Sequence, residues 1–109
     1  MPRTHKPSRV DANQVEIVAA LRKAGWEVAH LHMVGGIPDL LVSQKSTGIT
    51  MLVEVKVPGG KLTPAEAKFC EDWPGEIVVV YSGEDAVSKV NERAECWERL
   101  PFSEPLEAV

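Results

Sequence analysis

The chain has 109 residues, of which 44% are hydrophobic and 26% are charged, and its formal net charge at pH 7 is −4. This length predicts one domain with one modest core, and the acidic balance argues against a general nucleic-acid binder, because neutralising phosphates requires Lys and Arg. No apolar run approaches the length of a membrane span and the first ten residues lack the apolar core of a signal peptide, so we expect a cytoplasmic protein that does not engage a membrane.

The chain begins with a basic segment. Arg3, His5, Lys6 and Arg9 are its only ionisable side chains, whereas acidic residues gather in 71–109. Residues 1–10 are therefore predicted to be a flexible arm, which is either unstructured or in contact with DNA. The folded domain is expected over residues 11–100, followed by an irregular tail, residues 101–109.

A helix is predicted from Asp11 onward. Asp11 has Gln14 three residues further on, which is a capping-box arrangement, and apolar residues follow at helical spacing through Leu21 until Gly25. At 100° per residue, Gln14 lies in line with the buried stripe. Glu16 lies nearly opposite, toward solvent or a partner subunit.

Residues 26–34 alternate as a strand does, which places His30 and His32 on one face. Two interpretations are open: the histidines bind a metal ion or act on a proton, or they form hydrogen bonds with the backbone or water. No third metal ligand follows at a recognisable spacing. After them, Gly35 and Gly36 permit a tight turn or a close backbone approach, where a DNA strand could pass.

Two apolar, β-branched segments, 38–43 and 49–57, flank a polar loop that ends in glycine, a pattern that predicts a β-hairpin. Closing the hairpin at the centre of the loop pairs residues whose numbers sum to 93. Asp39 then faces Glu54 across the hairpin at about 5 Å.

Strand alternation places Glu54 and Lys56 on the same face, about 7 Å apart. Two facing carboxylates repel each other, and a divalent cation would remove that repulsion; Mg²⁺ typically takes one or two carboxylates and completes its shell with water and phosphate. Lys56 could then orient a water or stabilise charge at a scissile phosphate. The residues therefore indicate a metal site for cutting a phosphodiester backbone, or else only a surface ion pair.

After the hairpin, Lys61 lies in a glycine-containing loop where it could meet a phosphate. A helix over 63–73 begins with Thr63 as N-cap, a proline next and Glu66 in the capping-box position, which accounts for Glu66 without a catalytic role. Residues 76–81 are almost continuously apolar, as expected of a strand covered on both faces.

Ser82 can cap a third helix, in which Ala86, Val90 and Ala94 have the spacing of core residues. The order of elements predicts an α/β fold with a mixed sheet. The first three strands form an antiparallel meander because their loops are short, and the fourth is parallel because a helix precedes it. The two cysteines, Cys70 and Cys96, have no metal-ligand spacing and are predicted to be reduced thiols.

The pattern Pro38-Asp39, fourteen residues, then Glu54-x-Lys56 resembles the PD-(D/E)XK nuclease superfamily. The wider runs GIPDLLV, LVEVK and LTPxE resemble its small VRR-NUC and Holliday-junction-resolvase-like members, including short phage-type nucleases, over roughly residues 11–90. The resemblance implies a single-domain αβββαβ(α) restriction-endonuclease-like core, with a mixed four-stranded sheet flanked by helices.

The same resemblance implies a Mg²⁺- or Mn²⁺-dependent endodeoxyribonuclease, a hydrolase acting on branched DNA such as a Holliday junction. Asp39, Glu54 and the carbonyl of Val55 would bind the ion, and Lys56 would position or activate the attacking water. Relatives often bring a further acidic side chain from the first helix. Gln14 occupies that place here, where it either coordinates through its amide oxygen or holds a metal-bound water, or else only closes the capping box. It supplies no charge, which leaves Asp11 and Glu16 open as the contribution of this helix.

A junction resolvase cuts two symmetrically related strands, so a homodimer is expected. One alternative is a nickase or flap nuclease of phage replication or repair. Another is a non-catalytic DNA- or protein-binding module, because one fold can serve several functions.

Overall fold

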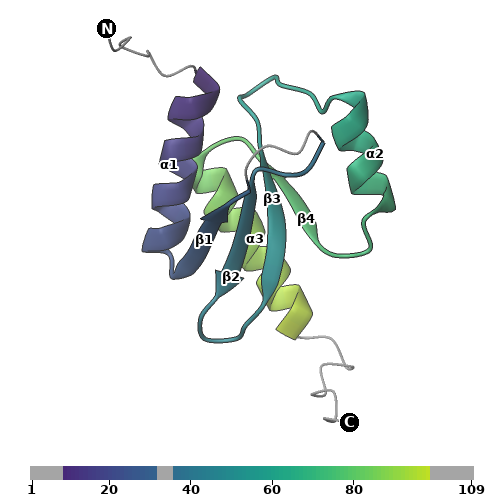
Figure 1. Cartoon of the computed structure of the whole chain (residues 1–109). Coiled ribbons are helices and arrows are strands. Elements are labelled where there is room, and N and C mark those ends of the chain that lie inside the picture. The colour runs from purple at the N-terminus through teal and green to yellow at the C-terminus, as the bar shows by residue number, and fades with distance from the viewer. Residues whose placement is uncertain (1–8, 32–35, 99–109) are drawn as a thin grey trace, which may run out of the picture.

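Three helices and four strands make up the described residues, 9–31 and 36–98, of this computed structural model, in which the side chains of residues 9–11 are not described. The helices are α1 (Arg9–Lys23), α2 (Pro64–Asp72) and α3 (Gly83–Glu98), and the strands are β1 (Trp26–His30), β2 (Leu40–Gln44), β3 (Thr50–Val55) and β4 (Ile77–Val80) (Figure 1). The chain is thus a small α/β domain, as the sequence predicted.

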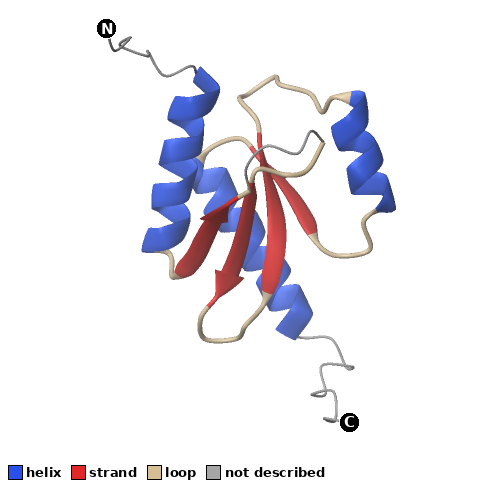
Figure 2. Ribbon diagram, viewed as in Figure 1, coloured by secondary structure: helices blue, strands red, loops and turns tan. Residues whose placement is uncertain are grey.

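The strands form one mixed sheet in the order β1-β2-β3-β4. β1 pairs antiparallel with β2, β2 pairs antiparallel with β3, and β4 lies parallel to β3. α1 packs against α3, β1 and β3, while α3 packs against β4. α1 and α3 lie together, and α2 stands apart from them (Figure 2). The predicted meander and the parallel fourth strand are both confirmed.

The hairpin has the predicted register. Leu40 pairs with Val53, and each further pair to Ser43 with Thr50 also has numbers that sum to 93. The Gln44 N–H donates to the Ile49 carbonyl at 2.9 Å, and Gly48 has a φ of 75°. The positive φ favours glycine at the end of this loop.

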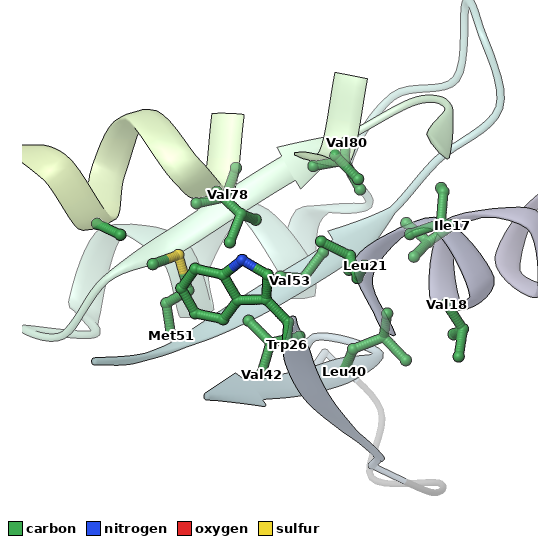
Figure 3. Packing of buried hydrophobic residues seen from close by; sticks show 14 residues of the cluster. Ile17, Val18, Leu21, Trp26, Leu40, Val42, Met51, Val53, Val78 and Val80 are labelled. Atoms are coloured by element: carbon green, nitrogen blue, oxygen red, sulfur yellow. The ribbon is translucent and has the colours of Figure 1, made fainter. Parts of the chain in front are cut away.

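The core lies between the sheet and the α1–α3 pair. Met51 and Val53 of β3 lie in it together with Leu40 and Val42 of β2 (Figure 3). Val55, the next alternate residue of β3, belongs to the same buried cluster. Leu52, Glu54 and Lys56 therefore share the opposite face, because side chains alternate along a strand. The core residues are Ile17, Val18, Leu21, Trp26, Leu40, Val42, Met51, Val53, Val55, Val78, Val80, Ala86, Val90 and Ala94.

α1 has the predicted buried stripe but not the predicted start. Ile17 and Leu21 are fully buried, yet the helix begins at Arg9, so Asp11 lies in its first turn and is not the N-cap. The capping-box pattern from Asp11 is a local signal, and the helix extends two residues beyond it. Glu16 is exposed as expected, but its Oε2 accepts a hydrogen bond from Gly83 N at 2.9 Å and joins α1 to α3.

The other helix starts are as predicted. Thr63 caps α2 with a complete capping box that includes Glu66, and Ser82 Oγ accepts a hydrogen bond from Asp85 N at 3.0 Å at the start of α3. Ala86, Val90 and Ala94 are buried on α3. Both cysteines, Cys70 and Cys96, are free. None of the helices in the described part of the chain is long and apolar enough to span a membrane.

Two strand predictions need correction. β1 ends at His30, and residues 32–35, which include His32 and Gly35, lie outside the described residues. β4 is not covered on both faces, since Val78 and Val80 are buried but Ile77 and Val79 are only half-buried. β4 lies at the edge of the sheet and packs on α3 through one face.

Candidate functional site

Asp39 lies just before β2, and the hairpin register places it opposite Glu54. Its carboxylate Oδ2 accepts a hydrogen bond from Val55 N at 2.8 Å, and its backbone carbonyl accepts one from Leu31 N at 2.9 Å. The hydrogen bond and charge of the Asp39 carboxyl both raise the pKa of Glu54, so the two carboxyls act on each other. The two predicted acids therefore converge on one face of the hairpin.

The Glu54 member of the acid pair is desolvated. Glu54 is only 3% exposed, and among the described residues it is the one charged side chain that is buried. Burial, the hydrogen bond and charge of Asp39 and the charge of Glu66 together raise the pKa of Glu54 from 4.5 to about 8, while the Lys56 ammonium acts in the opposite direction. Without a cation, the Glu54 carboxyl therefore holds a proton at neutral pH.

The Lys56 side chain lies beside the acids, but its shortest contact is with α2. Its Nζ donates to Glu66 Oε1 at 2.7 Å, while Glu54 Oε2 lies 3.7 Å away. Burial lowers the pKa of Lys56, but the hydrogen bond with Glu66 and the surrounding acids outweigh it and raise the pKa above 10.5. Lys56 is therefore a persistent ammonium.

Glu66 is a site residue that sequence reasoning missed. Its Oε1 accepts from both Lys56 Nζ at 2.7 Å and Thr63 N at 2.8 Å, so one carboxylate completes the capping box and holds the lysine. Burial works to raise the pKa of Glu66, but the hydrogen bonds from Lys56 and Thr63 hold it below its ordinary value. The capping box explained this residue fully in the sequence, and only the packing of α2 reveals its second contact.

Both backbone polar groups of Lys56 form hydrogen bonds. Its N–H donates to the Val80 carbonyl at 2.9 Å, and its carbonyl accepts from Asn13 Nδ2 at 2.8 Å. The same Asn13 nitrogen donates to the Tyr81 carbonyl at 3.1 Å. Asn13 is thus an α1 residue that contacts this region, whereas the helical wheel pointed to its neighbour.

Gln14 is half-buried and does not contact the acids. It lines a hollow of about 280 Å³ between α1 and β1, and no hydrogen bond within the described residues joins it to Asp39, Glu54 or Lys56. The lining residues of this hollow are Gln14, Val15, Val18, Ala19, Arg22 and His30. The wheel placed Gln14 correctly beside Val18, but that stripe faces β1 and not the end of the hairpin.

Of the three residues expected to contact DNA, Gly36 and Lys61 belong to the described part of the chain. Lys61 is exposed in the loop before α2. Gly36 has a φ of 86°, and a Cβ there would lie 3.3 Å from the Cβ of Ala65. Because Gly36 has no side chain, the first turn of α2 can pack closely against it. Gly35 lies outside the described residues.

The oxygen donors present fit a hard divalent cation. Asp39 and Glu54 provide two carboxyls, the number that Mg²⁺ usually accepts. The Val55 carbonyl points to the same side of β3 as its N–H, and therefore toward Asp39. No group of three or more His, Cys, Asp or Glu side chains in residues 9–31 and 36–98 is arranged to hold a metal ion.

Comparisons with protein-family models, curated proteins and solved structures found no match.

Proposed function

We propose that the protein is a Mg²⁺- or Mn²⁺-dependent endodeoxyribonuclease that hydrolyses phosphodiester bonds with a PD-(D/E)XK-type site. The observation that supports this most is the convergence of Asp39 and Glu54 with the Lys56 ammonium, which lies 3.7 Å from Glu54 Oε2. The residue types and their order match the motif that the sequence resembles.

Asp39, Glu54 and the Val55 carbonyl would hold the ion. Two adjacent carboxyls, of which Glu54 is desolvated, are unfavourable for the fold, because like charges repel and burial penalises the charged form. In the free protein a proton on Glu54 relieves this repulsion, and in the enzyme a cation would take its place. When bound, the ion lowers the pKa of a ligating water and stabilises charge on the phosphate.

Lys56 would act as a fixed positive charge and hydrogen-bond donor. Its raised pKa keeps it protonated, so it is not a general base while Glu66 holds it. An ammonium at this position can orient the attacking water and stabilise negative charge at the scissile phosphate. Glu66 fixes where that charge sits.

The substrate is proposed to be branched DNA such as a Holliday junction, and the active form a homodimer. A two-fold dimer places two sites symmetrically, which suits the cutting of two symmetrically related strands. The basic residues Arg3, Lys6 and Arg9 lie in the first nine positions of an otherwise acidic chain, so we assign the DNA contacts to these residues and to Lys61. Binding should weaken steeply as salt rises.

The test is a cleavage panel of junction, flap, nicked and linear DNA with Mn²⁺ or Mg²⁺. The Lys56→Ala variant should lose cleavage while its fold and DNA binding remain. Lys68→Ala is the matched control, since Lys68 is an exposed lysine of α2 that pairs with Asp72 at 2.8 Å, and it should cleave normally.

Each result of the panel has a definite meaning. Preference for the flap or nicked substrate would replace the junction assignment with a flap nuclease or nickase. If the wild-type protein leaves all four substrates uncut but binds DNA, the enzyme assignment fails and a non-catalytic binding module replaces it.

A further inference from the structure

We infer that Asn13 is a positioning residue for Lys56, acting from α1 through the backbone of the lysine. This inference rests on the proposed function in its account of catalysis, but the contact that carries it belongs to the fold. Both hydrogens of the Asn13 side-chain amide are used: one bond goes to the Lys56 carbonyl at 2.8 Å, the other to the Tyr81 carbonyl at 3.1 Å.

These two carbonyls lie where the parallel strands β3 and β4 end. Lys56 follows the last residue of β3, and Tyr81 follows the last residue of β4. Beyond Lys56 the chain enters a loop with Gly59 and Gly60, where the sheet no longer restrains it. A glycine-containing loop restrains its neighbours weakly, because glycine has the largest conformational freedom.

Asn13 therefore completes the restraint on the backbone of Lys56. The Lys56 N–H is bonded to Val80 and its carbonyl to Asn13, so both backbone groups are held although the residue lies outside β3. At the other end of the side chain, Glu66 holds Nζ. Because the backbone and the Nζ of Lys56 are both held, the ammonium stays at its distance from the Glu54 carboxylate.

The residue type suits this role. Only a side-chain amide or a cation presents two N–H donors to two carbonyls, and a carboxylate in the same place would repel both. In this chain Asn13 contributes no charge, and its oxygen is not needed for the two bonds.

The experiment compares Asn13→Asp and the milder Asn13→Ala with the control Glu16→Gln. Glu16 lies one turn away on α1 and also bonds to a backbone group, Gly83 N at 2.9 Å, but not to β3. Hydrogen exchange reports the protection of the Lys56 amide, which donates to Val80. Steady-state cleavage with Mn²⁺ separates kcat from KM, at a temperature where every variant is folded.

We expect Asn13→Asp and Asn13→Ala to lose protection at Lys56 and to lower kcat by about 10- to 100-fold with KM nearly unchanged, as for a misplaced reacting group. Glu16→Gln should leave both quantities near wild type. If Asn13→Asp fails to fold, Asn13→Ala decides. Equal loss in all three variants, or normal kcat after Asn13→Ala, would overturn the inference. If the wild-type protein cleaves no DNA, the proposed function fails. The hydrogen-exchange result alone then decides whether Asn13 restrains the backbone of Lys56.

Discussion

The Lys56 ammonium and the Glu66 carboxylate are joined by a hydrogen bond of 2.7 Å that links the end of β3 to the first turn of α2. Both side chains are 17% exposed. Glu66 thus has two structural tasks, one in the helix cap and one at the lysine. Variants that separate the two tasks can test which one the site requires.

Replacing Glu66 by Gln should disturb the lysine and leave the cap nearly intact. Glutamine also serves in a capping box, but it carries no charge to hold the ammonium. We expect the pKa of Lys56 to fall toward its ordinary value, because the hydrogen bond and charge of Glu66 are among the causes that raise it. The change can be followed by NMR titration of the Lys56 side chain, and DNA cleavage should slow.

Thr63→Ala is the matched variant for the cap. It removes the side-chain oxygen that accepts from Glu66 N at 3.2 Å, which should lower the free energy of unfolding by about 0.5 to 2 kcal/mol. The pKa of Lys56 should change little, since Glu66 retains its charge. A larger pKa change after Thr63→Ala than after Glu66→Gln would show that the cap, and not the carboxylate charge, positions the lysine.

The stability of the metal-free protein should fall as pH rises from about 4.5 to about 8. In this window Glu54 is ionised in the unfolded chain but still protonated in the folded one, because burial and Asp39 raise its pKa from 4.5 to about 8. The folded state binds more protons, so its stability decreases with increasing pH, by on the order of a few kcal/mol over the window.

Urea unfolding at several pH values measures this slope, and Glu54→Gln is the control because it cannot titrate. The variant should lack most of the decline between pH 5 and pH 8. If the stability of the wild type instead changes with pH as that of the variant does, the Glu54 carboxyl is not desolvated.

Asp39→Asn should have opposite effects on the free and the metal-loaded protein. At pH 9, where the Glu54 carboxyl of the wild type is ionised, removing the Asp39 charge should stabilise the metal-free protein by on the order of 1 kcal/mol. The asparagine oxygen can still accept from Val55 N, a bond of 2.8 Å in the wild type.

With Mg²⁺ present, the wild type should gain stability that grows with the logarithm of the free ion concentration, and Asp39→Asn should gain much less. Thermal unfolding with and without Mg²⁺ measures both effects. If the variant is destabilised without metal and responds to Mg²⁺ as the wild type does, the acid pair is not a cation site.

Two adjacent leucines of β2 test which face of the sheet carries the core. Leu40 is fully buried under the helices, whereas Leu41 is 37% exposed on the opposite face. Leu40→Ala should lower the free energy of unfolding by about 2 to 5 kcal/mol, and Leu41→Ala by less than about 1 kcal/mol. Equal losses in urea unfolding would mean that the second face is covered as fully as the first.

Features that depend on near neighbours were predictable. The polar loop fixed the centre of the hairpin and thereby its register, which places Asp39 opposite Glu54. The caps at Thr63 and Ser82 follow from residues within one helical turn. The same kind of signal gave a wrong start for α1, since the pattern from Asp11 is also compatible with a helix that begins at Arg9.

Contacts between distant elements could not be predicted in this way. Gln14 and Asn13 are adjacent on α1, and a helical wheel states which side they occupy but not which strand lies opposite. The packing of α1 on the sheet directs Asn13 to Lys56 and Gln14 to a hollow beside His30. The wheel angle was right, and the missing information was the position of the helix over the sheet.

By itself, the sequence determined the elements, the faces of the strands and the pairing of the two acids, because strand alternation, turn chemistry and helix capping act over a few residues. Only the tertiary structure decided that Glu54 is desolvated, that Glu66 holds Lys56 and that Asn13 bonds to the end of β3. These features depend on how helices pack against the sheet. A local pattern specifies the shape of each element, but the environment of a charge is set by all the elements around it.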